Sequence, residues 1–159
     1  LPAFSAASSQ QPKGVDTSQW QTARARLGDV TYSYRYPAGW SADLAWCAPG
    51  AGEKAGEGGD LPPNCISTDL LAGQKALDVG RLTGTPLMVG NRAANRQVVT
   101  TPTNVLVSRI YTVMVYDSAG RPLFGLSTQV GHDTDAATLE EITASLDGVV
   151  QTLQVEAQR

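Results

Sequence analysis

The segment Thr138–Leu153, TLEEITASLDGVVQTL, decides the fold of this chain. Its apolar residues are spaced three, four, three and four positions apart and therefore share one stripe of an α-helix; they are Leu139, Ile142, Leu146, Val149 and Leu153. Asp135 is suited to cap the helix N-terminus, and Thr138 with Glu141 would form a capping box if the helix began one turn later. Because no second long helix is predicted, the stripe must be buried against a β-sheet.

The sheet is expected upstream of this helix, where apolar and polar residues alternate. Alternation is clearest over Val30–Tyr36 and resumes over Trp40–Trp46, and the turn Pro37-Ala38-Gly39 between them predicts a β-hairpin. Val105–Tyr116 is β-branched and aromatic and too long for one flat strand, so a bulge or bend is expected. With Leu123–Val130 it forms a second hairpin, which is central because both strands carry apolar residues on both faces.

Shorter elements account for the remaining chain. We expect short helices over Ser18–Leu27 and Ala72–Leu82, and short strands over Ile66–Leu70, Thr85–Gly90 and Gln97–Thr100. Strands followed by a covering helix predict an α+β domain with a mainly antiparallel sheet of about five to seven strands covered by helices. This single domain would span residues 18–159, and residues 1–17, which include the small polar segment SAASSQQP, would form a flexible tether.

The composition excludes several classes of protein. Of the 159 residues, 42% are hydrophobic and 17% are charged, with 12 basic and 15 acidic residues and a net charge of -3. This balance provides no positive field for nucleic acid. No stretch of about 18 uncharged apolar residues predicts a transmembrane segment. The length suits one domain that buries a core without a metal or cofactor.

Cys47 and Cys65 are the two cysteines, and the segment between them is rich in glycine and proline. Such a segment cannot pack by itself, so a disulfide between its ends would stabilise the fold by about 3 kcal/mol. Two buried thiols in a cytosolic protein are the alternative. The single histidine leaves too few ligands for a zinc site with these cysteines. A disulfide would place the protein outside the cytoplasm, in a periplasm, in a cell envelope or as a secreted protein.

An aromatic set is the first candidate binding feature: Tyr32, Tyr34, Tyr36, Trp40 and Trp46. These side chains either fill the core beside the C-terminal helix or form an exposed stacking surface for a sugar or a partner protein. On the second interpretation, Tyr34, Trp40 and Trp46 are the candidate binding residues.

Arginines are the second candidate feature. Arg92 and Arg96 lie in the polar segment NRAANR, and in a loop they could hold an anion, although solvated arginines are the simpler interpretation. Arg109 shares a strand face with Val107 and Tyr111, so we expect it to pair with a carboxylate.

His132, in the segment GHDTD, is the only histidine. A catalytic triad would have to use it, but the chain has no GxSxG motif, and a loop histidine near a helix N-terminus is the simpler interpretation. Asp133 and Asp135 alone cannot complete a calcium shell and more simply complement the helix dipole. We therefore assign no catalytic and no metal-binding residue.

Three segments resemble landmarks of PsbP-like proteins and occur in the same order: YRYPAGW at Tyr34–Trp40, VYDSAGRPLF at Val115–Phe124 and ITASLDGV at Ile142–Val149. That family includes extrinsic photosystem II subunits and many bacterial lipoproteins. The resemblance implies an α-β-α sandwich around an antiparallel sheet in a non-enzymatic, exported protein that docks on larger assemblies. A lipid anchor upstream of Leu1 is compatible with it. The insertion bracketed by Cys47 and Cys65 departs from the family pattern, so no photosynthetic role is carried over.

These observations predict a non-enzymatic, exported accessory or binding domain that docks on a protein or cell-envelope component. A different class of function is a small extracytoplasmic hydrolase or metal-dependent enzyme centred on His132. A third is an interaction loop presented between Cys47 and Cys65.

Overall fold

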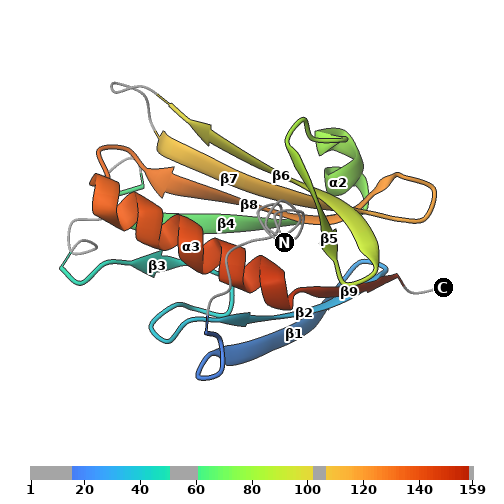
Figure 1. Ribbon diagram of the computed structural model, residues 1–159, viewed down its shortest axis with the longest axis horizontal. Coiled ribbons are helices and arrows are strands. Elements are labelled where there is room, and N and C mark those ends of the chain that lie inside the picture. The colour runs from blue at the N-terminus through green and yellow to red at the C-terminus, as the bar shows by residue number, and fades with distance from the viewer. Residues whose placement is uncertain (1–15, 51–60, 102–106, 158–159) are drawn as a thin grey trace, which may run out of the picture.

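The computed structural model describes residues 16–50, 61–101 and 107–157, so the expected tether over residues 1–17 lies almost wholly outside the described residues. The largest element is a six-stranded sheet with the strand order β3-β4-β8-β7-β6-β5 (Figure 1). In that order the strands span Trp46–Cys47, Cys65–Ala72, Pro122–Gly131, Val107–Tyr116, Arg92–Thr100 and Thr85–Val89. All neighbouring strands are antiparallel, and the predicted α+β class with an antiparallel sheet is confirmed.

The predicted central hairpin is confirmed as β7 and β8. Every residue from Tyr111 to Tyr116 is buried, because both faces of β7 are covered. The predicted irregularity is also present, since the register of β7 against β8 shifts between Val107 and Arg109 and again between Val115 and Tyr116.

A smaller sheet has the order β1-β2-β9, with the strands Gln21–Leu27, Val30–Tyr36 and Gln154–Ala157. The helix predicted over Ser18–Leu27 is therefore wrong, because most of this segment is strand β1. The deciding feature is the two-residue turn Gly28-Asp29, in which Gly28 has φ 62°, as the first position of a type II′ hairpin turn requires. Strand β9 was not predicted.

The hairpin predicted between Val30–Tyr36 and Trp40–Trp46 is also wrong. Strand β2 pairs with β1 and β9, whereas Trp46 and Cys47 form the short strand β3 of the larger sheet. In between, the N–H of Leu44 donates to the carbonyl of Ser41, and Leu44 is buried at φ 61°. The alternating apolar residues of this segment therefore do not form a strand. Two of them, Trp40 and Leu44, are buried and anchor the turn to the core.

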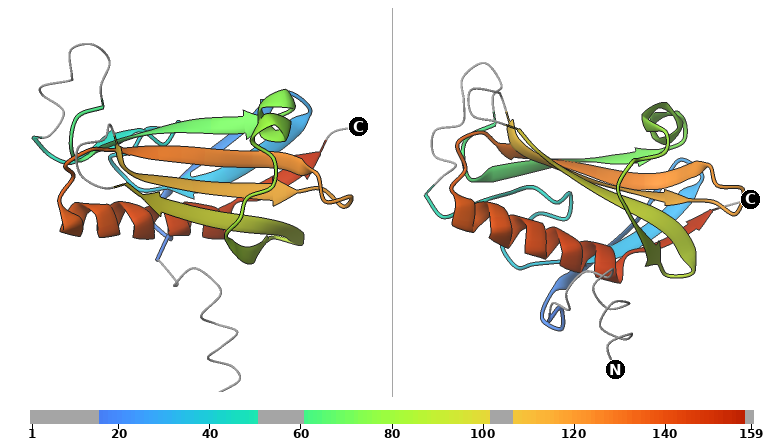
Figure 2. Two further views of the ribbon diagram at one scale, coloured as in Figure 1. Left: turned by 90° about the horizontal axis from the view of Figure 1, so that it is seen from above. Right: turned by 45° about the horizontal axis from the view of Figure 1, so that its top comes forward.

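The predicted C-terminal helix is confirmed as α3, Ala136–Thr152. Asp135 is its N-cap, and the Asp135 side chain accepts a hydrogen bond from the N–H of Thr138. The alternative start one turn later, with Thr138 and Glu141 as a capping box, is therefore excluded. Helix α3 lies across one face of the six-stranded sheet (Figures 1 and 2). Its residues Ile142, Leu146, Val149 and Val150 are buried, and Leu139 at the start of the stripe is half-buried. The chain then passes through the buried Leu153 directly into β9.

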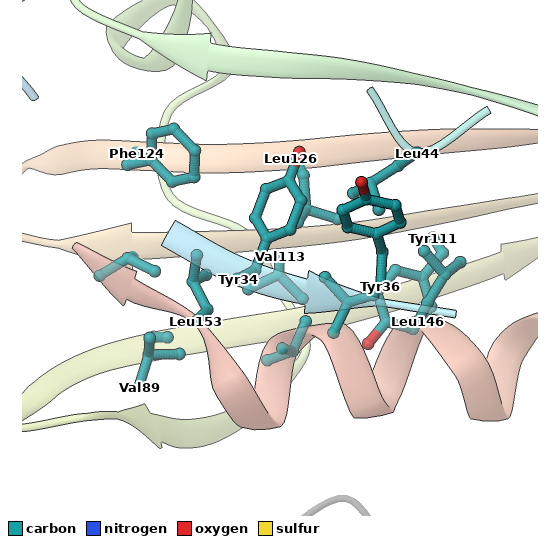
Figure 3. Close-up of a cluster of buried hydrophobic side chains, with 14 of the residues drawn as sticks. Tyr34, Tyr36, Leu44, Val89, Tyr111, Val113, Phe124, Leu126, Leu146 and Leu153 are labelled. Atoms are coloured by element: carbon teal, nitrogen blue, oxygen red, sulfur yellow. The ribbon is translucent and has the colours of Figure 1, made fainter. Parts of the chain in front are cut away.

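The main core lies between the six-stranded sheet on one side and α3 with the smaller sheet on the other. Figure 3 shows Tyr34 and Tyr36 of β2 among residues of β8 and α3. The rings of Tyr32 and Phe124 stack at 4.8 Å between β2 and β8, which joins the two sheets.

The opposite face of the six-stranded sheet carries the short helix α2, Gln74–Val79. This helix is shorter than the predicted Ala72–Leu82, because Gly73 and Gly80 flank it with φ of 60° and 77°. A second, smaller core lies beneath it and contains Leu71, Ala76, Met114 and Tyr116. We call this side of the sheet the α2 face.

The predicted disulfide between Cys47 and Cys65 is confirmed. The two residues are cross-strand partners in β3 and β4, with Cα atoms 4.0 Å apart. The N–H of Ala48 donates to the carbonyl of Asn64, which continues the pairing by one step. The bond therefore fixes the ends of the long segment at the edge of the sheet.

Removal of this disulfide should lower stability without changing the fold. The double variant Cys47→Ala/Cys65→Ala should lose about 3 kcal/mol, since it frees a long loop in the unfolded chain. That corresponds to a fall of roughly 6–12 °C in the thermal midpoint. Circular dichroism melts of the variant and of the reduced native protein should agree, and an unchanged midpoint would contradict the assignment.

The cap at Asp135 should make stability depend on acid pH. The hydrogen bond from the Thr138 N–H lowers the pKa of Asp135. The stabilisation is therefore complete above the unfolded-state pKa of about 3.9 and is lost as the pH falls through the lower folded-state pKa. The variant Asp135→Asn keeps a capping oxygen that does not titrate. Thermal melts should show a constant difference between the two proteins from about pH 5 to 7 and a selective loss for the native protein below about pH 4.

Candidate functional site

The aromatic set is largely part of the core. Tyr34 is 2% exposed and Trp40 is 8% exposed, so neither can form an exposed stacking surface. The hydroxyl of Tyr34 donates to the carbonyl of Ala42, and burial raises the pKa of Tyr34. Trp46 is half-buried, and its ring stacks on Trp40 at 5.9 Å. The core interpretation therefore accounts for Tyr34 and Trp40, and Trp46 reaches the surface only in part.

The segment Asn91–Arg96 is not the loop that the sequence suggested. Gly90 and Asn91 form a two-residue turn, and strand β6 begins at Arg92. Arg92 Nε donates to the carbonyl of Val155 in β9. Arg96 forms a bidentate ion pair with Asp147 of α3, with Nε–Oδ1 and Nη2–Oδ2 distances of 2.7 and 3.1 Å. The guanidinium that was a candidate anion ligand thus already holds a carboxylate.

Tyr111 completes this cluster between sheet and helix. Its hydroxyl donates to Oδ1 of Asp147, and the Arg96 guanidinium lies 5.1 Å from the centre of its ring. Burial raises the pKa of Tyr111 well above its usual value, and the charge of Asp147 adds to the shift, so this hydroxyl remains a donor. Burial opposes the charge of Arg96, but its hydrogen bond to Asp147 and its attraction to Tyr111 and Asp147 keep its pKa raised.

Arg109 pairs with a carboxylate, as predicted. Its Nη1 donates to Glu140 Oε2 at 3.3 Å and to the hydroxyl of Thr143 at 2.8 Å, both on α3. Its Nε donates to Thr100 in β6. Arg109 and the Arg96 cluster therefore dock one polar edge of α3 on β6 and β7.

His132 lies in the connection between β8 and α3, next to Asp133. His132 Nε2 lies 3.9 Å from Asp133 Oδ2, and the side chain of His132 is partly exposed. In the part of the chain that the structure describes, no three side chains among His, Cys, Asp and Glu gather to bind a metal ion. Within the same residues, no helix is both long and apolar enough to span a membrane.

Sequence reasoning missed a groove of about 720 Å³ next to β5. It is lined by the connection from α2 to β5 and by strands β5, β6 and β7; the residues are Arg81–Gly84, Pro86–Met88, Ala93–Asn95 and Tyr116. Asn95 is the cross-strand partner of Met114, which packs beneath α2, so the groove opens on the α2 face. Met88 in the lining is 51% exposed.

Both backbone polar groups of Leu82 hold the wall of the groove to the sheet, and Gln97 Nε2 adds hydrogen bonds to Thr83. The N–H of Leu82 donates to the hydroxyl of Tyr116 at 3.0 Å, and the carbonyl of Leu82 accepts from Asn95 Nδ2 at 2.7 Å. Arg81 lies 4.3 Å above the ring of Tyr116 and donates to the carbonyl of Gly120. A Cβ at Gly84 would collide with the carbonyl of Arg96, so glycine permits the close approach to β6.

The two carboxylates that dock α3 should differ in their effect on stability. Asp147 is 16% exposed and serves both Arg96 and Tyr111, so Asp147→Ala should cost about 2–3 kcal/mol. Glu140 is 73% exposed, and Glu140→Ala should cost less than about 1 kcal/mol. Urea unfolding of both variants measures the two costs, and equal losses would show that the Asp147 cluster is not the main polar contact of the helix.

Comparisons with known proteins give no family for this chain. No family model matches it, and no curated protein does so. Among solved structures, a crystal structure from Bacteroides thetaiotaomicron VPI-5482 is similar at a TM-score of 0.40 and 14% identity. The match covers 89% of this chain and 49% of that one, so this chain spans about half the length of its structural neighbour.

Proposed function

We propose that this chain is a non-catalytic binding domain whose groove on the α2 face holds part of a protein or of a cell-envelope component. The observation that carries the proposal is a preformed groove of about 720 Å³ with the exposed Met88 in its lining. Leu77 and Val79 of the neighbouring helix α2 are also exposed, and exposed apolar side chains around a concavity are typical of interaction sites.

The chemistry of the lining supports binding over catalysis. Among the lining residues, the ionisable side chains are Arg81 and Tyr116, and these two already contact each other. Of the other polar side chains in the lining, Asn95 donates to the carbonyl of Leu82, and the hydroxyl of Thr83 accepts from Gln97 Nε2. Such a surface offers shape, apolar area and one positive charge to a ligand.

We further propose that the domain works outside the cytoplasm and is PsbP-like. The Cys47–Cys65 disulfide supports the first part, because such bonds persist in oxidising compartments. The antiparallel sheet with α3 across it supports the second part. Attachment to the envelope through a lipid anchor upstream of Leu1, which the resemblance to PsbP-like proteins allows, is part of the same proposal.

Site-specific photo-crosslinking tests the groove. A photoreactive side chain in place of Met88 should give a discrete adduct in the envelope fraction of the producing cells. The matched control is Val99, which is 44% exposed on the same sheet face and is not among the lining residues of the groove. The substitution Met88→Asp should weaken binding of the captured component roughly tenfold, and Val99→Asp should leave it unchanged. Equal adducts at both positions, or none at Met88, would contradict the proposal.

A further inference from the structure

Strand β1 has an open edge with a defined hydrogen-bonding pattern. Leu27 and Val30 flank the two-residue turn, so they form a hydrogen-bonded pair, and such pairs alternate along the hairpin. The backbone N–H and C=O groups of Thr22, Arg24 and Arg26 therefore point away from β2. The same alternation directs the N–H of Arg35 away from β1, where it donates to the hydroxyl of Thr152. No described strand pairs with the outer edge of β1.

The two faces of β1 differ in chemistry. Arg24 and Arg26 lie opposite Ser33 and Thr31, and Thr22 lies opposite Arg35, so the three arginines share the face that points away from the core. All three are exposed, and none pairs with a described carboxylate, whereas Arg96, Arg109 and Arg121 do. Glu156 shares this face but lies on β9, the strand farthest from β1.

The other face of β1 is apolar beyond Gln21 and largely uncovered. It carries Ala23, Ala25 and Leu27, of which Ala25 and Leu27 are exposed and Ala23 is half-buried. An added strand would therefore meet positive charge on one face and small apolar side chains on the other, in alternate positions.

Self-association at this edge is disfavoured by charge. A second copy pairing antiparallel along the full outer edge would centre on Arg24, which places Arg24 of one copy beside Arg24 of the other. Like charges directly opposite one another destabilise a strand pair. An acidic segment would instead be attracted at the same positions.

We propose that the outer edge of β1 binds an extended segment of a partner protein in which acidic and apolar residues alternate. The segment adds as a fourth strand to the smaller sheet, its acidic side chains beside Arg24 and Arg26 and its apolar side chains beside Ala25 and Leu27. Main-chain hydrogen bonds to Thr22, Arg24 and Arg26 hold it in register. The surface is separate from the groove, which opens on the far side of the six-stranded sheet.

Two synthetic peptides test this proposal with the whole chain. An acetylated and amidated peptide of alternating Glu and Val should bind, and its Lys-Val counterpart should not. The variant Arg24→Glu/Arg26→Glu should reverse this preference, with roughly tenfold changes in affinity. Because the variant gains a ligand as it loses one, a folding defect cannot mimic the result. Binding should also weaken several-fold as salt rises from about 50 to 200 mM.

Amide hydrogen exchange supplies the second readout. The bound Glu-Val peptide should slow exchange at the N–H groups of Thr22, Arg24 and Arg26, which point away from β2, while Ala23 and Ala25 are protected beforehand by their pairing with β2. Equal binding of both peptides, no binding, or binding without this protection would overturn the proposal. The groove variant Met88→Asp should bind the peptide normally, so failure of one surface is distinguishable from failure of the other.

Discussion

Helix α3 has to be covered from two sides, and the rest of the structure follows from that constraint. Its apolar stripe faces the six-stranded sheet and the residues of β2, and the chain leaves the helix directly into β9, which completes the smaller sheet. A single amphipathic helix therefore fixes the spacing of both sheets. Its polar edge is matched separately, by Arg96 and Tyr111 around Asp147, so rotation of the helix would break both sets of contacts.

This arrangement places the two proposed binding surfaces on the outer sides of the two sheets. The core takes up Tyr34, Tyr36 and Trp40, the residues that look most like a binding surface in the sequence. The groove lies on the α2 face of the larger sheet, and the arginine face of β1 lies on the far side of the smaller one. The two proposed surfaces are thus separated by the full thickness of the molecule.

The sequence predicts those elements whose pattern is long and unambiguous. The stripe of α3, the double-sided β7–β8 hairpin and the Cys47–Cys65 bond were all predicted, the first from spacing and the other two from the composition of the segments concerned. Strand β1 was missed because Trp20, Ala23 and Leu27 also suit a helix, and the deciding signal was the glycine that opens the turn after Leu27. The turn Gly90-Asn91 gives the same signal before β6, and the prediction passed over it as well.

The candidate site was less predictable than the fold because distant residues build it. Arg96 and Asp147 are 51 positions apart, and no local pattern couples a strand arginine to one helix carboxylate. The groove likewise combines the Arg81–Gly84 connection with Tyr116 of β7. The three segments that resemble PsbP-like proteins contribute Tyr34, Phe124 and Ile142 to the core. A likeness in such positions bears on architecture and says little about a ligand.

The double attachment of Leu82 has a consequence for the kind of ligand that the proposed groove site would accept. Tyr116 and Asn95 form hydrogen bonds to both backbone polar groups of this residue in the absence of a ligand. Because the wall is already rigid, it loses little conformational entropy when a complex forms, and more of the contact energy is retained as affinity. The same rigidity prevents the wall from adapting to ligands of a different shape. Selectivity at the groove should therefore depend more on the shape of the ligand than on its hydrophobicity.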